Sequence, residues 1–207
     1  MEHPEPIPQP GALVQSPWDC ELDETAVIDQ ARAEPALFAP LYERYFPRVY
    51  RYCRRRMNRP EDAEDLTALV FTRALAGLGT FRGGSVAAWL FRIAHNAVAN
   101  ELRARRPHAS LDGTAAALAS DLPAPDEAAT ELLREEERQR IAQLLARLPE
   151  DQRELLVLKL AGELTAGEIG AVLGKSEGAV RVALHRIVQQ LRAAYAEMEQ
   201  TEAEERP

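Results

Sequence analysis

Two helix-start signals and one helix-stop signal lie close together between Thr165 and Ser176. Thr165 and Glu168 have the spacing of a capping box, in which each side chain bonds the other residue's backbone amide. Gly174 is typical of a helix end, and Ser176 is typical of the cap of a following helix. That helix carries an inward apolar stripe at steps of three and four residues: Val180, Leu184, Ile187, Val188 and Leu191. This part of the chain is therefore constrained to a short helix, a tight turn and a longer helix.

Such a pattern is typical of a helix-turn-helix, whose second helix lies in the major groove of DNA. The N-terminal end of that helix reaches base edges, while flanking basic groups meet phosphates. The residues placed there are Lys175, Ser176, Glu177, Arg181, His185 and Arg186. A helical hairpin whose charges form only a solvated face is the alternative.

The rest of the sequence also favours helices. Glycine is scarce and aromatic residues make up 6% of the chain, a balance that disfavours a sheet-rich fold. Residues 1–34 and 107–129 are rich in proline and acid, and we expect them to be mostly flexible apart from a short helix at residues 24–32. We therefore predict an all-α fold of two small helical domains, residues 35–106 and 130–194, joined by a flexible acidic linker and followed by an acidic tail at residues 195–207.

The net charge of −8 hides an alternation of sign along the chain. Residues 35–59 carry +6 and residues 81–106 carry +4, whereas residues 1–34 and 107–137 each carry −7. A local basic surface that binds phosphates is therefore compatible with the acidic total.

No catalytic or metal-binding constellation is visible in the sequence. The histidines are scattered, there is no glycine-rich phosphate loop, and Cys20 and Cys53 lack the spacing of a zinc site. We therefore expect free thiols, no cofactor and no enzymatic activity. The N-terminus has no basic segment followed by an apolar core, and charges interrupt every long apolar stretch, which predicts a cytoplasmic protein without membrane insertion.

Three segments resemble parts of bacterial sigma factors. The sequence Leu148-Pro149-Glu150-Asp151-Gln152-Arg153-Glu154, taken with the helix-turn-helix, resembles region 4. Asp62-Ala63-Glu64-Asp65-Leu66 with Val70-Phe71 and Arg73-Ala74 resembles region 2.2. Trp89-Leu90 followed by Ile93-Ala94-His95-Asn96 and Arg103 resembles regions 2.3 to 2.4. Two such units in this order, with an unrelated tether between them, are similar to the extracytoplasmic-function (ECF) sigma factors. The resemblance implies a transcription initiation factor that binds core RNA polymerase. Its region 4 would read the −35 element, and its region 2 would melt and read the −10 element.

In that family the region 2.2 helix docks on the clamp helices of the beta-prime subunit, and region 4 meets the beta flap. The resemblance therefore places five residues at or behind a polymerase contact: Asp62, Glu64, Asp65, Leu66 and Phe71. For the carboxylates the alternative is stabilisation of the helix N-terminus, worth about 0.3 to 1 kcal/mol each. Ala68 and Leu69 stand where family members usually carry a glutamine and an acid, which implies a differently tuned affinity for polymerase.

The resemblance also implies that region 2 holds an unstacked base of the −10 strand between the loop at residues 81–85 and the next helix. The residues placed there are Arg82, Arg92, His95, Asn96, Asn100 and Arg103. Their side chains offer hydrogen-bonding edges and cations, as an extruded base and its backbone require. Trp89 lies on the apolar stripe of its helix, so we expect it in the core rather than stacked on a base. For His95, a DNA contact and an exposed position without a role are equal alternatives.

Three further assignments stay open at the level of sequence. An arginine stripe, Arg44, Arg48, Arg51 and Arg55, is either a solvated face or a contact to duplex phosphates or polymerase. The resemblance implies that the acidic linker threads the basic channel of polymerase, attracted by Asp112, Asp121, Asp126 and Glu127, and a passive spacer is the alternative. An anti-sigma factor is the expected regulatory partner. A helix-turn-helix repressor or activator that is not a polymerase subunit is the second function, and a helical enzyme or adaptor is the third.

Overall fold

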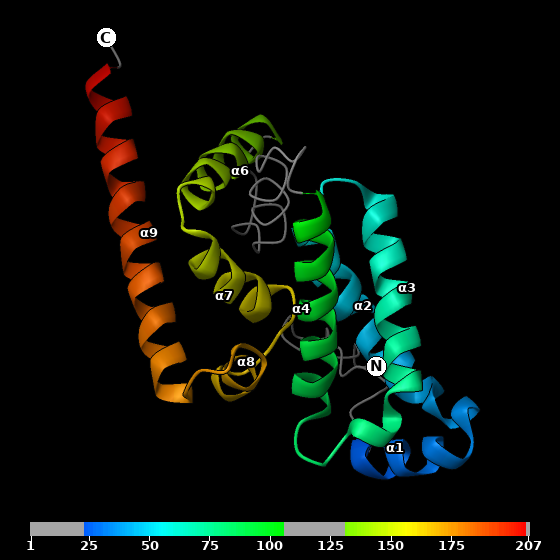
Figure 1. The fold of residues 1–207 in the computed structure, drawn as a ribbon. Coiled ribbons are helices and arrows are strands. Elements are labelled where there is room, and N and C mark those ends of the chain that lie inside the picture. The colour runs from blue at the N-terminus through cyan, green and yellow to red at the C-terminus, as the bar shows by residue number, and fades with distance from the viewer. Residues whose placement is uncertain (1–22, 106–130, 206–207) are drawn as a thin grey trace, which may run out of the picture.

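The structure is a computed structural model that describes residues 23–105 and 131–205. Both ranges are helical, and neither contains a strand (Figure 1). The prediction of an all-α fold is therefore confirmed. The predicted linker with its four acids lies outside the described residues, as do Cys20 and most of the N-terminal segment.

The first unit is a bundle of three helices side by side (Figure 1). They are α2 (Ala39–Arg56), α3 (Pro60–Ala76) and α4 (Val86–Arg105). Short turns of 3-10 helix precede α2 at Pro35–Phe38 and follow α3 at Leu78–Thr80. Ser85 caps α4, as predicted, by accepting a hydrogen bond of 3.1 Å from the amide of Ala88. The bundle is closed by buried side chains from all three helices, among them Leu41, Val70 and Phe91.

Helix α1 (Glu24–Ala33) crosses one end of this bundle (Figure 1). Ile28 and Ala31 are completely buried there. Arg32 extends from the same helix and donates to the carbonyl oxygens of Leu78 at 3.2 Å and Phe81 at 2.7 Å. Residues 24–33 are therefore integrated into the first unit, although the sequence predicted that this unit begins at residue 35.

The second unit consists of α6 (Glu131–Ala146), α7 (Glu150–Leu160), α8 (Ala166–Leu173) and α9 (Glu177–Glu205). The predicted capping box is present, because the Thr165 amide donates to the Glu168 carboxylate at 2.8 Å and the Glu168 amide donates to the Thr165 hydroxyl at 3.3 Å. Gly174 ends α8 with a left-handed φ of 68°, and the Ser176 hydroxyl caps α9. The predicted short helix, turn and long helix are confirmed.

Helix α9 is longer than the sequence suggested. It continues to Glu205, through the segment that was predicted as a separate acidic tail beginning at residue 195. The hydroxyl of Tyr195 donates to the Glu137 carboxylate of α6 at 2.8 Å, which fixes α9 beyond the predicted end of the second unit. Further along, α9 projects past the other helices (Figure 1).

The two units pack directly against each other. Helix α4 of the first unit lies beside α8, and α2 lies beside α7 (Figure 1). The buried apolar side chains of both units form one continuous cluster. The sequence predicted two units but not their direct contact. Among the described residues, no helix combines the length and the apolar character needed to cross a membrane.

Candidate nucleic-acid interface and the contact between the units

The N-terminal part of α9 is presented to solvent by a close crossing of α8 and the turn that follows it. The amide of Lys175 donates to the carbonyl of Gly170 at 2.9 Å. A Cβ atom on Gly170 would lie 2.5 Å from the Lys175 carbonyl oxygen, so only glycine permits this approach. All six residues predicted to meet DNA are exposed: Lys175, Ser176, Glu177, Arg181, His185 and Arg186. Within this set Arg181 forms an ion pair with Glu177 one turn earlier.

The residues predicted to meet polymerase separate into exposed and buried positions on α3. Glu64 and Asp65 are exposed and Asp62 is half-buried. Leu66 and Phe71 are each 4% exposed and belong to the core. These two apolar side chains therefore lie behind the exposed surface rather than on it.

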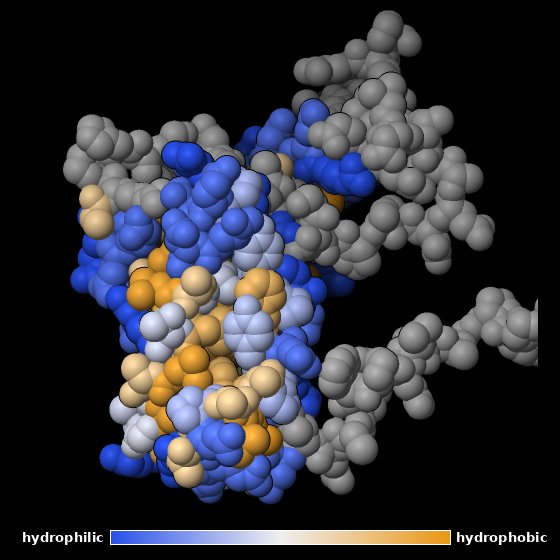
Figure 2. All heavy atoms as spheres, turned by 90° about the vertical axis from the view of Figure 1, so that its right-hand side faces the viewer, coloured by the Kyte–Doolittle hydropathy of each residue, from blue (hydrophilic) through white to orange (hydrophobic). Residues whose placement is uncertain are grey.

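Beside these acids the molecule exposes an α2/α3 apolar patch, in which the rings of Tyr42 and Phe46 of α2 pack on Phe71 of α3. Leu69 and Leu75 of α3 are exposed as well. Figure 2 shows apolar side chains gathered across this side of the molecule, with polar side chains above and below them. The buried ring of Phe71 supports the patch from behind, with its centroid 4.7 Å from that of Tyr42 and 6.2 Å from that of Phe46.

Two of the six residues predicted to read the −10 strand, Arg82 and Arg92, line a cleft of about 590 Å³. One wall is formed by residues 80–85 with Trp89 and Arg92, and the other by Thr165, Gly167, Glu168 and Ala171 of the second unit. Trp89 is half-buried, and its indole nitrogen donates to the Thr80 hydroxyl at 3.3 Å. It therefore packs on the core, as predicted, and also lines the cleft.

All six residues predicted to read the −10 strand lie on α4 or on the loop before it. Arg82, Asn96, Asn100 and Arg103 are exposed. Arg82 donates to the carbonyl of Gly79 at 2.9 Å, and Arg103 donates to Asn100 Oδ1 at 2.7 Å. Arg92 and His95 differ, because both contact the second unit. Arg92 donates to the Ala171 carbonyl, and His95 Nδ1 lies 2.9 Å from Glu154 Oε1.

Glu154 is the centre of a buried polar cluster between the units. It extends from α7 and is 5% exposed. The Tyr52 hydroxyl donates to Glu154 Oε1 at 2.7 Å, and Arg56 Nε lies 3.2 Å from Glu154 Oε2 in an ion pair without hydrogen-bond geometry. Burial tends to raise the pKa of Glu154, but the His95 hydrogen bond, the Arg56 charge and the Tyr52 hydroxyl hold this pKa below its ordinary value. The carboxylate is therefore charged although it is buried.

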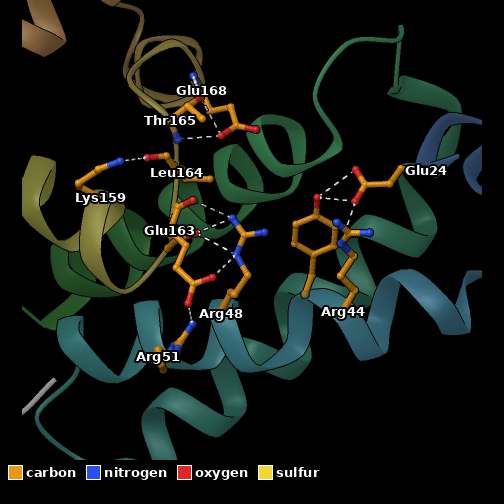
Figure 3. A network of polar contacts seen from close by, with 11 residues as sticks. Glu24, Arg44, Arg48, Arg51, Lys159, Glu163, Leu164, Thr165 and Glu168 are labelled. Atoms are coloured by element: carbon orange, nitrogen blue, oxygen red, sulfur yellow. Dashed lines mark hydrogen bonds and ion pairs between the residues drawn. The ribbon is translucent and has the colours of Figure 1, made fainter. Parts of the chain in front are cut away.

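The arginine stripe of α2 also meets the second unit (Figure 3). Arg48 donates through Nε and Nη2 to the Gly162 carbonyl at 3.0 and 2.7 Å, and its Nε lies 3.6 Å from Glu163 Oε2. Arg51 pairs with the Glu163 carboxylate, whereas Arg44 pairs with Glu24 of α1. Arg55 is 5% exposed, and burial with the neighbouring Arg54 and Arg51 charges lowers its pKa to about 10. A purely solvated face, one of the open interpretations of the stripe, is therefore wrong.

For three acids of the second unit the sequence predicted no contact with the first unit. They are Glu154, Glu163 and Glu168. Glu154 follows Glu150 and Asp151 near a helix start, where acids are expected in any case. Glu168 was explained by its capping role, but its carboxylate also accepts a 2.7 Å hydrogen bond from Ser85. The only usable sequence signal was that the acids at residues 150–174 could complement the basic residues 35–59.

Family models match both units of the chain. Residues 41–108 match sigma-70 region 2, and residues 138–191 match sigma-70 region 4. The chain is 41% identical over 183 residues to the ECF RNA polymerase sigma factor ShbA of Streptomyces griseus, which covers 81% of this chain and 90% of that protein. It is 30% identical to the ECF RNA polymerase sigma factor SigW of Bacillus subtilis, over 72% of this chain and 83% of that protein.

A solved structure of CnrH in complex with the cytosolic domain of CnrY has a similar fold. It is 24% identical, with a TM-score of 0.60, and the match covers 82% of this chain and 94% of that chain. The sigma factor RpoE of Bartonella quintana, crystallised with the anti-sigma factor NepR, is 20% identical with a TM-score of 0.54. That match covers 76% of this chain and 95% of the other. Both likenesses bear on the fold alone.

Proposed function

Because the chain belongs to the ECF sigma factors of the sigma-70 family, we propose that its second unit reads the −35 promoter element and its first unit reads the −10 element. The chain is a transcription initiation factor that associates with RNA polymerase and directs it to promoters. As a subunit that selects DNA it carries out no chemical step itself. Its place of action is the cytoplasm, where polymerase and promoter DNA are found.

The exposed face of α9 carries the proposal for the −35 element. It begins at a capped N-terminus, and the glycine contact in the turn fixes its crossing with α8. Lys175 and Arg186 supply charge for phosphates, while Arg181 and His185 lie where a recognition helix presents side chains to base edges. The ion pair with Glu177 holds Arg181 along the helix, and this arginine would exchange that partner for a guanine edge on binding.

The exposed surface of α3 supports docking on the clamp helices of the beta-prime subunit. Glu64 and Asp65 offer charge at the start of the surface, and the α2/α3 apolar patch offers area that is unusual for an exposed helix. Helix-dipole stabilisation explains acids in the first turns of α3, but it does not explain exposed aromatic rings beside them. Contact between the second unit and the beta flap completes the proposed polymerase interface.

An anti-sigma factor is the proposed regulator of this chain. The two solved relatives above are complexes with such a partner or with a cytosolic domain of another protein. We extend the same mode of control to this chain because its fold is similar over most of its length.

Multi-round transcription with purified core polymerase on a genomic promoter library tests the function. The expected result is initiation at a defined promoter set. Arg181→Ala should weaken −35 recognition by about 1 to 3 kcal/mol and relax specificity at one base position. Arg192→Ala is the matched control, because it removes the same charge from an exposed position further along α9. Binding to palindromic sites without polymerase, and no initiation with it, would favour a repressor or activator instead.

Polymerase docking is tested by Asp65→Arg combined with Leu69→Glu. Both residues are exposed, so the double variant should retain its helix content while losing affinity for core polymerase. Leu66→Ala is a poor probe because Leu66 is buried and its truncation weakens the core. Normal holoenzyme assembly by the folded double variant would refute the assignment of this surface.

A further inference from the structure

Helix α1 is held to the first unit at both of its ends. At its start, the Tyr45 hydroxyl of α2 donates to the Glu24 carboxylate at 2.9 Å, and Arg44 pairs with the same carboxylate (Figure 3). At its end, Arg32 reaches the turn between α3 and α4. The helix precedes the residues that match sigma-70 region 2, so the region 2 assignments give it no role.

All three guanidinium nitrogens of Arg32 have a partner. Nε donates to the Leu78 carbonyl at 3.2 Å, Nη2 donates to the Phe81 carbonyl at 2.7 Å, and Nη1 pairs with Asp29 of α1 at 2.7 Å. The planar guanidinium presents its donors in a fixed geometry, which a lysine ammonium does not reproduce. The Phe81 carbonyl belongs to the same planar peptide unit as the Arg82 amide. Binding of this carbonyl therefore fixes the plane from which Arg82 extends.

The loop at residues 81–85 has little rigidity of its own. Gly83 and Gly84 have positive φ values of 88° and 87°, which glycine adopts readily. Among the described residues outside the adjoining peptide units, no atom lies within 4 Å of where a Cβ on either glycine would be. Glycine also loses more conformational freedom on ordering than any other residue. The position of the loop therefore depends on its two ends, which are Phe81, bound by Arg32, and Ser85, which caps α4.

We propose that Arg32 is a positioning residue for −10 recognition, and that α1 fixes the loop at residues 81–85 through it. The link to the −10 element rests on the proposed function of this loop, whereas the positioning itself does not. Arg32 acts through the Phe81 carbonyl, so its removal lets Arg82 and the two glycines sample more positions. A recognition loop that is held less tightly discriminates less between a matched and a mismatched base.

Trp89 reports the state of the segment that Arg32 binds. Its indole nitrogen donates to the Thr80 hydroxyl at 3.3 Å, and its ring centroid lies 5.7 Å from that of Phe81. The chain contains one other tryptophan, and Trp18→Phe leaves Trp89 as the source of tryptophan emission. In this background Arg32→Ala should raise the constant for quenching of Trp89 by acrylamide. An unchanged constant, with unchanged helix content, would overturn the positioning role.

Two variants separate positioning from charge and from stability. Arg32→Lys keeps the charge but not the planar fork, so it should also raise the quenching constant. Tyr45→Phe is the matched control, because it weakens the other end of α1 and leaves both carbonyl contacts of Arg32 in place. It should lower the free energy of unfolding without changing the quenching constant. Equal increases in Arg32→Ala and Tyr45→Phe would show a general loosening of α1 and overturn the assignment, as would wild-type quenching in Arg32→Lys.

Selectivity is measured with core polymerase on one promoter from the library assay and on its single-base variants. The preference of Arg32→Ala for the parent −10 sequence over its variants should fall about tenfold, the effect of losing one hydrogen bond from a charged donor. Its preferences among −35 variants should stay unchanged, as should both sets of preferences in Tyr45→Phe.

The outcomes of the two measurements are distinguishable. Equal −10 preferences in the wild type and in Arg32→Ala, with a raised quenching constant, would show that the loop loosens without changing recognition and would overturn the specificity role. Absence of initiation by the wild type would count against the proposed function instead, while the quenching result would still report whether Arg32 positions the loop.

Discussion

Separating Arg56 from Glu154 should cost several kilocalories per mole, because the pair is buried between the units. Each side chain is 7% exposed, so neither charge can be rehydrated while the contact persists. Truncating one member of a buried pair typically costs about 3 to 5 kcal/mol. Arg56 keeps a second partner in Glu150, which is 52% exposed. We therefore expect Glu154→Gln to lower the free energy of unfolding by about 3 kcal/mol, at the lower end of that range.

The reverse truncation should be milder. In Arg56→Met the Glu154 carboxylate keeps the hydroxyl of Tyr52 and the ring of His95, and hydrogen bonds to charged groups are worth about 1.5 to 3 kcal/mol each. We expect Arg56→Met to lower the free energy of unfolding by about 2 kcal/mol. The double variant should lose about 2 kcal/mol less of this free energy than the two single variants lose together.

Urea unfolding of the four proteins, followed by far-ultraviolet circular dichroism and by tryptophan fluorescence, measures this cycle. In the wild type the two probes should report one transition, since the pair couples the units. In the single variants the transitions should separate. Glu150→Gln is the control, because its half-exposed charge should contribute only about 0 to 1 kcal/mol. Additivity of the two substitutions within about 0.5 kcal/mol would refute the assignment of Arg56 and Glu154 as a coupled pair.

Three further outcomes can be checked on the same material. Thr165→Ala should lower the stability of the second unit by about 1 kcal/mol through loss of the α8 cap, measured as a fall in Tm, and an unchanged Tm would contradict the capping role. Gly170→Ala should cost more than Gly174→Ala and should abolish −35 binding, measured by gel shift, because its Cβ would lie 2.5 Å from the Lys175 carbonyl oxygen. Acid should weaken the fold through Glu154, whose pKa is depressed in the folded chain. Its contribution is complete above the unfolded pKa of about 4.3 and is lost as the pH falls through the folded value, so Glu154→Gln should flatten that part of a stability–pH curve.

Local structure was the part of the fold that the sequence predicted best. The Thr165 capping box, the Gly174 helix end and the Ser176 cap depend on neighbouring residues, and each was found where it was predicted. Periodicity was less reliable at the margin of an apolar stripe. Val188 was placed on the inward stripe of α9 but is 39% exposed, whereas the adjacent Ile187 is 1% exposed and lies at the centre of the buried face.

Exposure agrees with part of the predicted site. The six residues predicted to meet DNA lie on α9 and in the turn before it, and all of them are exposed as a recognition helix requires, while their role stays a prediction. Leu66 and Phe71 show the limit of the same reasoning, since a motif match does not distinguish a surface contact from the core behind it. The α2/α3 apolar patch depends on two helices lying side by side, so its members could not be grouped before the fold was known.

Packing of one unit on the other had no local signal, because its determinants are far apart in the chain. Arg51 and Glu163 are 112 residues apart, and Tyr52 and Glu154 are 102 residues apart. Each of these residues is ordinary for its own helix or turn. Charge alternation along the chain did show that the two contacting segments have opposite net charge, since residues 35–59 are basic and residues 150–174 are acidic. A basic surface attracts an acidic partner of suitable shape wherever that partner lies in the sequence. The contact between the units therefore rests on charges that only the fold brings together, and no pattern within one helix could have predicted it.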